Sequence, residues 1–322
     1  MPGFFALAML TVDETRCVHR LAAVARCRAC VDACPTGAWT MQPDGLDFDP
    51  ARCDGCGLCV PACPPGALAL AAPPALPLSG DTLSLACEHA PLAAGPLTRV
   101  PCLHAISEAR LLALYLAGLR RLGVVSGTCA TCPRGRVTPL VERLDALNDA
   151  LRAAGAPAIE LLPTAMPGEA APSRRRGFFG LLRPAARTAG PDTRPAALRL
   201  LASIGRGGGL WAVSLDVARC TGCAVCARLC PEGAIDWLEA GAEAGLRLRM
   251  ERCTGCNLCV DACDQGALRP GRAAGGVVVA FFHDTTCSRC SATFRRPAGH
   301  RAPPLCPVCR TGARRPDRLV VD

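Results

Sequence analysis

The residues of this chain that can do chemistry are its cysteines, and the densest run lies between residues 220 and 263. It holds two groups of four cysteines with one spacing, C-x2-C-x2-C-x3-C. The first group is Cys220, Cys223, Cys226 and Cys230, and the second is Cys253, Cys256, Cys259 and Cys263. Thiolates at this spacing can surround a metal centre, whereas adjacent CxxCxxC triplets are poor disulfide geometry. The pattern predicts metal ligation; eight disulfide cysteines are the alternative interpretation.

This run resembles the ligand run of bacterial two-cluster ferredoxins. Pro231 follows the first group as in that family, and Asp264 stands where the second proline would be. In the family three thiolates bind one [4Fe-4S] cluster and the fourth reaches the neighbouring cluster. The resemblance implies one cluster on Cys220, Cys223, Cys226 and Cys263. It implies a second cluster on Cys253, Cys256, Cys259 and Cys230.

Residues 1–78 resemble a first module of the same kind, with one irregularity. The downstream run is standard, but the upstream run keeps only its last three positions, and Cys17 is the only candidate for the missing ligand. The resemblance implies one cluster on Cys17, Cys27, Cys30 and Cys63. It implies another on Cys53, Cys56, Cys59 and Cys34.

The nine residues 18–26, which separate Cys17 from Cys27, leave two interpretations open. Their Ala and Leu content suits a short helix, but a straight helix of nine residues would rise about 13 Å and carry Cys17 away. If Cys17 is a ligand, the insertion must therefore fold back through a loop. Otherwise Cys17 is no ligand, and the site holds a [3Fe-4S] cluster or an iron with an open position.

Two further features repeat between the modules and indicate an internal repeat. Residues 38–49 centre on Pro-Asp-Gly and predict a hairpin, and residues 233–252 occupy the same place in the second module. A Gly-Ala pair follows the last cysteine of every run. These pairs are Gly37-Ala38, Gly66-Ala67, Gly233-Ala234 and Gly266-Ala267. We expect their backbone N–H groups to approach cluster sulfurs and raise the potentials; a plain turn is the alternative.

Residues 79–165 change character, because short strand candidates alternate with two helical patterns. This order predicts parallel strands joined by crossovers. Cys87 and Cys102 end the first two strands, and Cys129 and Cys132 follow the third. Because the carboxyl ends of parallel strands share one edge, four thiols should converge there.

The middle segment resembles the iron-sulfur delta subunit of methyl-viologen-reducing hydrogenase, through LACEHA, RVPCLH, the long helix and GTCATC. The resemblance implies a [2Fe-2S] cluster on these four thiols. Zinc in the same site and four inert buried cysteines are the alternatives. His89 and His104, each two residues after a ligand candidate, could donate to the site or bind its metal; we expect them to be solvated.

Residues 274–322 begin with a strand candidate and carry two CxxC knuckles. Their cysteines, Cys287, Cys290, Cys306 and Cys309, suit a zinc ribbon, which could hardly fold without metal. A rubredoxin-like iron site has the same thiolates.

Residues 166–207 are rich in Pro, Ala, Gly and Arg and predict a linker. Within it, the basic and apolar residues 174–183 form either a docking peptide or a weakly helical stretch.

The formal charge of +9 is a property of the apo sequence. With all thiols ligated to clusters and zinc, the net charge falls to about −3, which gives no reason to expect a nucleic-acid partner. No stretch reaches transmembrane length, and the N-terminal residues make a poor signal peptide. Metal-ligand spacings indicate a reducing compartment, so a cytoplasmic location is expected.

The sequence thus predicts an α+β multi-domain protein. Its units are a 2[4Fe-4S] module at 1–78, a four-cysteine α/β domain at 79–165, a linker at 166–207, a second 2[4Fe-4S] module at 208–273 and a zinc ribbon at 274–322. All 24 cysteines fall into six groups of four, so no thiol remains for a nucleophile, and no catalytic motif is present. The expected cofactors are four [4Fe-4S] clusters, one [2Fe-2S] cluster and one zinc.

These features favour an electron carrier or a relay subunit of a larger redox enzyme, with a formate dehydrogenase- or hydrogenase-type oxidoreductase as partner. One alternative is an accessory or maturation protein for a molybdenum or hydrogenase-type enzyme. Another is a redox-sensing regulator, which should show a basic, aromatic-bearing surface or a helix-turn-helix signal; the sequence has neither.

Overall fold

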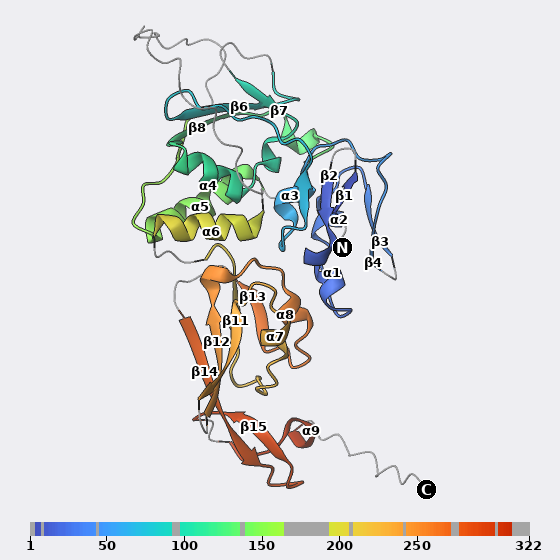
Figure 1. Cartoon of the computed structure of the whole chain (residues 1–322), viewed down its shortest axis with the longest axis vertical. Helices are drawn as coiled ribbons and strands as arrows, with labels where there is room; N and C mark the ends of the chain where they lie inside the picture. Colours follow the sequence, from blue (N-terminus) through green and yellow to red (C-terminus); the bar gives the residue numbers. More distant parts are fainter. Residues whose placement is uncertain are drawn as a thin grey trace.

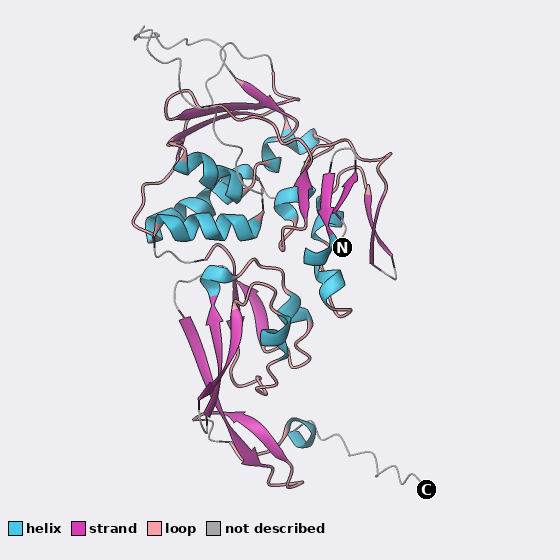
Figure 2. Ribbon diagram, viewed as in Figure 1, coloured by secondary structure: helices cyan, strands magenta, loops and turns pink. Residues whose placement is uncertain are grey.

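The computed structural model describes residues 4–7, 10–42, 45–91, 97–135, 139–163, 193–205, 209–240, 243–271, 277–299 and 302–310. The described chain is mixed α/β, with several small sheets and mostly short helices (Figures 1 and 2). Its buried apolar residues form separate clusters, the largest in the middle of the chain. The predicted docking peptide at 174–183 lies outside the described residues.

The first module is built from two small antiparallel sheets and very short helices. Strands β1 (Phe4–Leu7), β2 (Leu10–Asp13) and β5 (Leu68–Leu70) form one sheet. The predicted hairpin is present as β3 (Trp39–Gln42) and β4 (Gly45–Phe48). The helical pieces are η1 (Glu14–Arg16), α1 (Val18–Leu21), α2 (Ala29–Ala33) and α3 (Cys59–Ala62). Of the 18–26 insertion, only α1 is helical, and the rest is a returning loop.

The middle domain has the predicted parallel sheet. Its strand order is β7 (Thr98–Val100), β6 (Thr82–Cys87), β8 (Arg121–Val125) and β9 (Glu160–Leu161), and all three pairings are parallel. Helices α4 (Glu108–Leu116) and α5 (Leu140–Ala153) lie on one side of the sheet with α6 (Arg194–Ile204) (Figure 1). Short η2 (Leu103–Ala105) and η3 (Cys129–Thr131) follow β7 and β8.

Residues 166–207 were predicted to be a linker, but the described part of them contains helix α6. Thr193 accepts a hydrogen bond from the N–H of Ala196 as the N-cap, and Pro195 lies in the first turn, where its missing N–H costs nothing. Ala197 and Leu201 are buried in the middle-domain core. Composition suggested a linker, but the short apolar face is stabilised by tertiary packing.

The second module and the C-terminal segment share a sheet. Strands β10 (Ala212–Leu215) and β13 (Leu268–Gly271) pair antiparallel, near the short helices α7 (Val225–Leu229), η4 (Met250–Arg252) and α8 (Leu258–Asp261). The other sheet has the order β11 (Ile235–Ala240), β12 (Glu243–Arg249), β14 (Val277–Thr286) and β15 (Thr293–Pro297). Since β14 pairs with β12 and with β15, it runs from the second module into the C-terminal segment, whose last described element is α9 (Pro307–Arg310). The boundary expected at residue 274 therefore does not separate two sheets.

Candidate iron–sulfur and metal centres

The four ferredoxin-type runs end in one local structure. Three residues after the last cysteine, the glycine of the Gly-Ala pair lies in the left-handed region, with φ between 56° and 67°. The N–H of the following alanine donates to the cysteine Sγ over 3.2–3.3 Å. The pairs are Ala38–Cys34, Ala67–Cys63, Ala234–Cys230 and Ala267–Cys263. A backbone N–H group thus approaches a cysteine sulfur in every run, and such a bond to a cluster-bound sulfur would raise the cluster potential, as predicted for the cluster sulfurs.

The irregular run brings Cys17 to the cavity lined by Cys27, Cys30 and Cys63. This cavity measures about 550 Å³. The insertion folds back after α1, and His19 Nε2 donates to the Cys27 carbonyl oxygen at 2.7 Å, which closes the loop. Burial is the main cause that raises the pKa of the Cys30 thiol, and the neighbouring Cys63 and Cys27 raise it further. Metal ligation would have to release that proton.

The lining of this cavity shows whether it fits a cluster. Cys17, Cys27, Cys30 and Cys63 all line it, together with Trp39. Burial raises the pKa of the Cys59 thiol of the neighbouring group, and the indole N–H of Trp39, which lies by this thiol, opposes the shift. Four thiols around one cavity fit a [4Fe-4S] cluster.

The remaining ferredoxin-type thiols also meet across the two runs of each module. Cys220, Cys223, Cys226 and Cys263 line one small cavity. Burial raises the pKa of Cys59 to about 12, and the nearby charges of Cys34 and Cys53 add to this shift. Burial likewise raises the pKa of Cys256 to about 11, with Cys230 and Cys253 contributing. In each case the last cysteine of one run lies with the thiols of the other run.

In the middle domain, the ends of three parallel strands bring Cys87, Cys102, Cys129 and Cys132 around one small cavity. The N–H of Gly127 donates to Cys87 Sγ over 3.3 Å. A Cβ at Gly127 would lie 2.3 Å from the His89 carbonyl oxygen, so the close packing of this loop requires glycine.

The two histidines of the middle domain differ from each other. His89 is exposed, as expected of a loop residue. His104 is half-buried, and its Nδ1 accepts the Leu140 N–H at 3.0 Å at the start of α5. The expectation of a solvated His104 was therefore wrong, because this ring supports the first turn of a helix.

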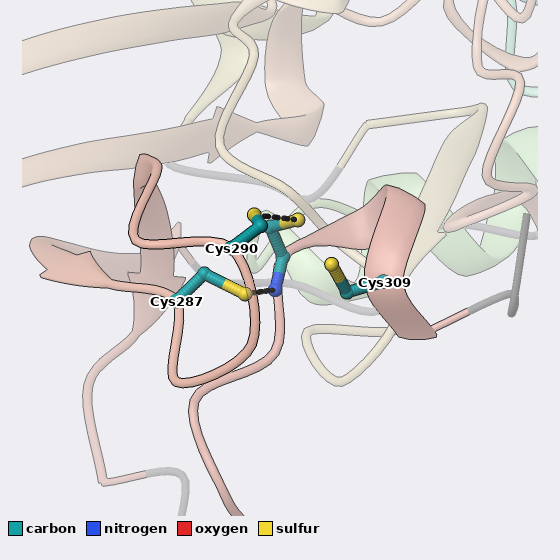
Figure 3. A group of neighbouring side chains, drawn as sticks. Cys287, Cys290 and Cys309 are labelled. Carbon is teal, nitrogen blue, oxygen red and sulfur yellow. Dashed lines mark hydrogen bonds between the residues drawn. The ribbon is translucent and has the colours of Figure 1, made fainter. Parts of the chain in front are cut away.

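The C-terminal knuckles form the tightest thiol group. The Sγ atoms of Cys287, Cys290, Cys306 and Cys309 all lie within 4.8 Å of one another, and the labelled side chains converge in Figure 3. The Cys290 and Cys306 sulfurs are 3.7 Å apart. Tetrahedral Zn–S bonds of about 2.3 Å imply sulfur–sulfur separations of about 3.8 Å, so this group fits one tetrahedral ion. The Cys306 N–H donates a hydrogen bond to Cys287 Sγ. This bond is the main cause that lowers the pKa of Cys287 to about 6.

Neighbouring thiol sites of different units also touch. Where the first module meets the middle domain, the shared apolar cluster consists of Cys56, Leu58, Cys102 and Ala105. Where the first module meets the second, Val18 and Ala25 of the insertion pack against Leu258, with Cys27 and Cys256 beside them. The structure therefore gives the irregular insertion a contact role that the sequence did not indicate.

Arg134 stabilises the contact between the first module and the middle domain through hydrogen bonds to both. Its Nε donates to Asp54 Oδ2 at 2.8 Å, and its Nη1 donates to Glu88 Oε2 at 3.1 Å and to the Pro101 carbonyl oxygen at 2.8 Å. Its side chain is only 13% exposed. Sequence analysis missed this residue, although its position two residues after Cys132 was a local signal.

Two segments of the chain match a family of known iron–sulfur proteins. Residues 24–67 and 219–267 match the family model described as a 4Fe-4S dicluster domain. The first match begins after Cys17, so the irregular ligand candidate lies outside it. These two segments are ferredoxin-like and indicate [4Fe-4S] clusters. The chain is an iron–sulfur electron-transfer protein.

No curated protein matches the chain. Among solved structures, it is similar to a chain of the formate dehydrogenase - heterodisulfide reductase - formylmethanofuran dehydrogenase complex from Methanospirillum hungatei. The identity is 13%, the match covers 91% of this chain and 81% of that chain, and the TM-score is 0.30. Among the described residues, no helix has the length and apolar character needed to cross a membrane.

Proposed function

We propose that this protein is a linear electron relay, the iron–sulfur subunit of a larger redox complex. The proposed order of clusters starts at the middle-domain site and passes through the Cys53 site and the Cys17 site. It continues through the Cys253 site to the Cys220 site. Each cluster would take up and release one electron, while the protein sets the spacing and the potentials.

The observation that carries this proposal is the contact between successive thiol groups. Cys56 and Cys102 share one apolar cluster, and Cys27 and Cys256 share another. Within the first module, Cys30 and Cys59, which we assign to different clusters, belong to one buried core. Contacts of this kind keep neighbouring clusters close and exclude water between them.

The exposure of the thiols supports the same order. Of the 24 cysteines, only Cys129 and Cys223 are exposed. Cys129 belongs to the first site of the proposed relay and Cys223 to the last. Electrons would therefore enter and leave at the two ends, while the thiols of the inner sites are buried or half-buried.

The assignments of the remaining groups complete the proposal. The middle site would hold a [2Fe-2S] cluster, and the C-terminal knuckles would hold structural zinc, for which the 3.7 Å separation between the Cys290 and Cys306 sulfurs is suitable. Redox partners would dock at the two ends, and a formate dehydrogenase- or hydrogenase-type oxidoreductase in the cytoplasm is the proposed complex.

Metal analysis of anaerobically purified full-length protein tests this function. We expect about 16 to 18 Fe per chain, nearly matching sulfide and about one Zn. Pulsed EPR of the reduced protein should show magnetic coupling between clusters of the two ferredoxin-type modules. Eight Fe or fewer in fully loaded protein would contradict the proposal, as would the absence of coupling between the modules.

A further inference from the structure

The contact between the two ferredoxin-type modules contains an arginine from neither of them. Arg194 is the first residue of α6, which packs in the middle domain. Figure 1 shows α6 on the side of that domain that faces the second module. Its N-cap, Thr193, lies so close to Gly66 of the first module that a Cβ there would come within 2.5 Å of the Thr193 Cβ. The start of α6 is thus packed against the first module.

The guanidinium of Arg194 joins the two modules through backbone carbonyl oxygens. Nε donates to Pro61 O and Nη2 to Ala62 O, each over 3.4 Å, at the end of α3 just before Cys63. Nη1 donates to Thr254 O at 3.1 Å, one residue after Cys253. Since α3 and the Cys253 loop carry thiols of different modules, one side chain touches both ligand loops.

The surroundings of the Arg194 guanidinium strengthen the effect of its positive charge on the neighbouring thiol groups. The guanidinium stacks on the Trp211 ring, with Cζ 4.7 Å from the ring centroid. Burial is the main cause that lowers the Arg194 pKa, and nearby Glu108 and the Cys63 and Cys27 thiols oppose the shift. The Arg194 side chain is half-buried, and a charge partly shielded from water acts on its neighbours more strongly than a fully solvated one. Guanidinium nevertheless stays protonated in proteins.

We propose that Arg194 is a positioning residue for electron transfer between the modules, and that it raises the potentials of the two clusters on either side of it. These are the clusters assigned to the Cys17 and Cys253 sites, so the inference rests on the proposed function. A nearby cation stabilises the reduced form of a cluster, which is the more negative one. The clusters at the Cys17 and Cys253 sites would therefore be easier to reduce than they would be without Arg194.

The test is an anaerobic redox titration of full-length holoprotein, followed by EPR. In Arg194→Gln, two of the four [4Fe-4S] potentials should become more negative and the other two should stay unchanged. Arg194→Lys keeps the charge and should restore the two potentials most of the way. Arg199→Gln is the matched control, because Arg199 is an exposed arginine on the same helix. Equal potentials in Arg194→Gln and Arg199→Gln would overturn the inference, as would a Lys variant that behaves like Gln.

A second variant covers the case in which Arg194→Gln fails to assemble. Glu108 is buried and its Oε2 has no hydrogen-bond partner among the described residues. Glu108→Gln removes a carboxyl group whose charge acts on the Arg194 guanidinium and should make the same two potentials less negative. No shift, or a shift in the opposite direction, would overturn the inference. Metal analysis of the wild type separates the two failures: missing clusters refute the function, and loaded clusters without these shifts refute only the role of Arg194.

Discussion

Leu258→Ala should loosen the contact between the two ferredoxin-type modules. Leu258 is fully buried and packs against Val18 and Ala25 of the insertion. Replacing a buried leucine by alanine costs about 2–5 kcal/mol, and the small cluster here can partly collapse, so we expect about 2–3 kcal/mol. At 1.4 kcal/mol per factor of ten, local opening becomes roughly 30- to 150-fold more frequent.

Hydrogen–deuterium exchange with mass spectrometry measures this opening. The peptide that covers the insertion includes the Arg26 amide, which donates to Asp261 Oδ2 of the second module at 2.8 Å. In Leu258→Ala, hydrogen exchange of the Arg26 amide should become roughly 30- to 150-fold faster, while the iron content stays unchanged. Leu246→Ala, at a buried position in the second-module core, is the control and should leave this peptide protected. Unchanged protection in Leu258→Ala would refute the proposed contact.

Two further predictions concern single cysteines that we propose as ligands. Cys17→Ser should convert or destabilise only the cluster assigned to Cys17, Cys27, Cys30 and Cys63, with a [3Fe-4S] EPR signal on oxidation; wild-type spectra and iron content would show that Cys17 is no ligand. Cys102→Ser should remove a [2Fe-2S] signal and leave the [4Fe-4S] signals intact. If the wild type shows no [2Fe-2S] spectrum but carries about two zinc ions per chain, the middle site binds zinc.

Much of the local structure could be predicted because its signals are local. The Pro-Asp-Gly turn predicted the β3–β4 hairpin, and the alternation of strands and helices predicted the parallel sheet of the middle domain. Gly-Ala after each run predicted the N–H donors to sulfur. Each feature depends on a few residues close in sequence, so spacing and residue type were sufficient.

The linker prediction failed in its described part because it averaged the composition of residues 166–207. Residues 193–204 alone carry helix signals, namely the N-cap Thr193, Pro195 in the first turn and an Ala- and Leu-rich run, and packing in the middle-domain core adds to the stability of α6. For β14, the apolar residues predicted a strand but not that it would pair with both β12 and β15. Which strands pair when they lie far apart in sequence depends on which apolar faces of the other elements are still exposed and must be buried.

The sequence by itself indicated the chemistry of this protein, since the thiol spacing favours metal ligation over disulfides and resembles that of two-cluster ferredoxins. Only the tertiary structure decided which centres are neighbours. Arg194 reaches Pro61 and Thr254 across 133 and 60 residues, and Arg134 reaches Asp54 across 80. No spacing rule covers such distances, because these contacts arise only when separate apolar faces pack together and bring the loops that carry the thiols side by side.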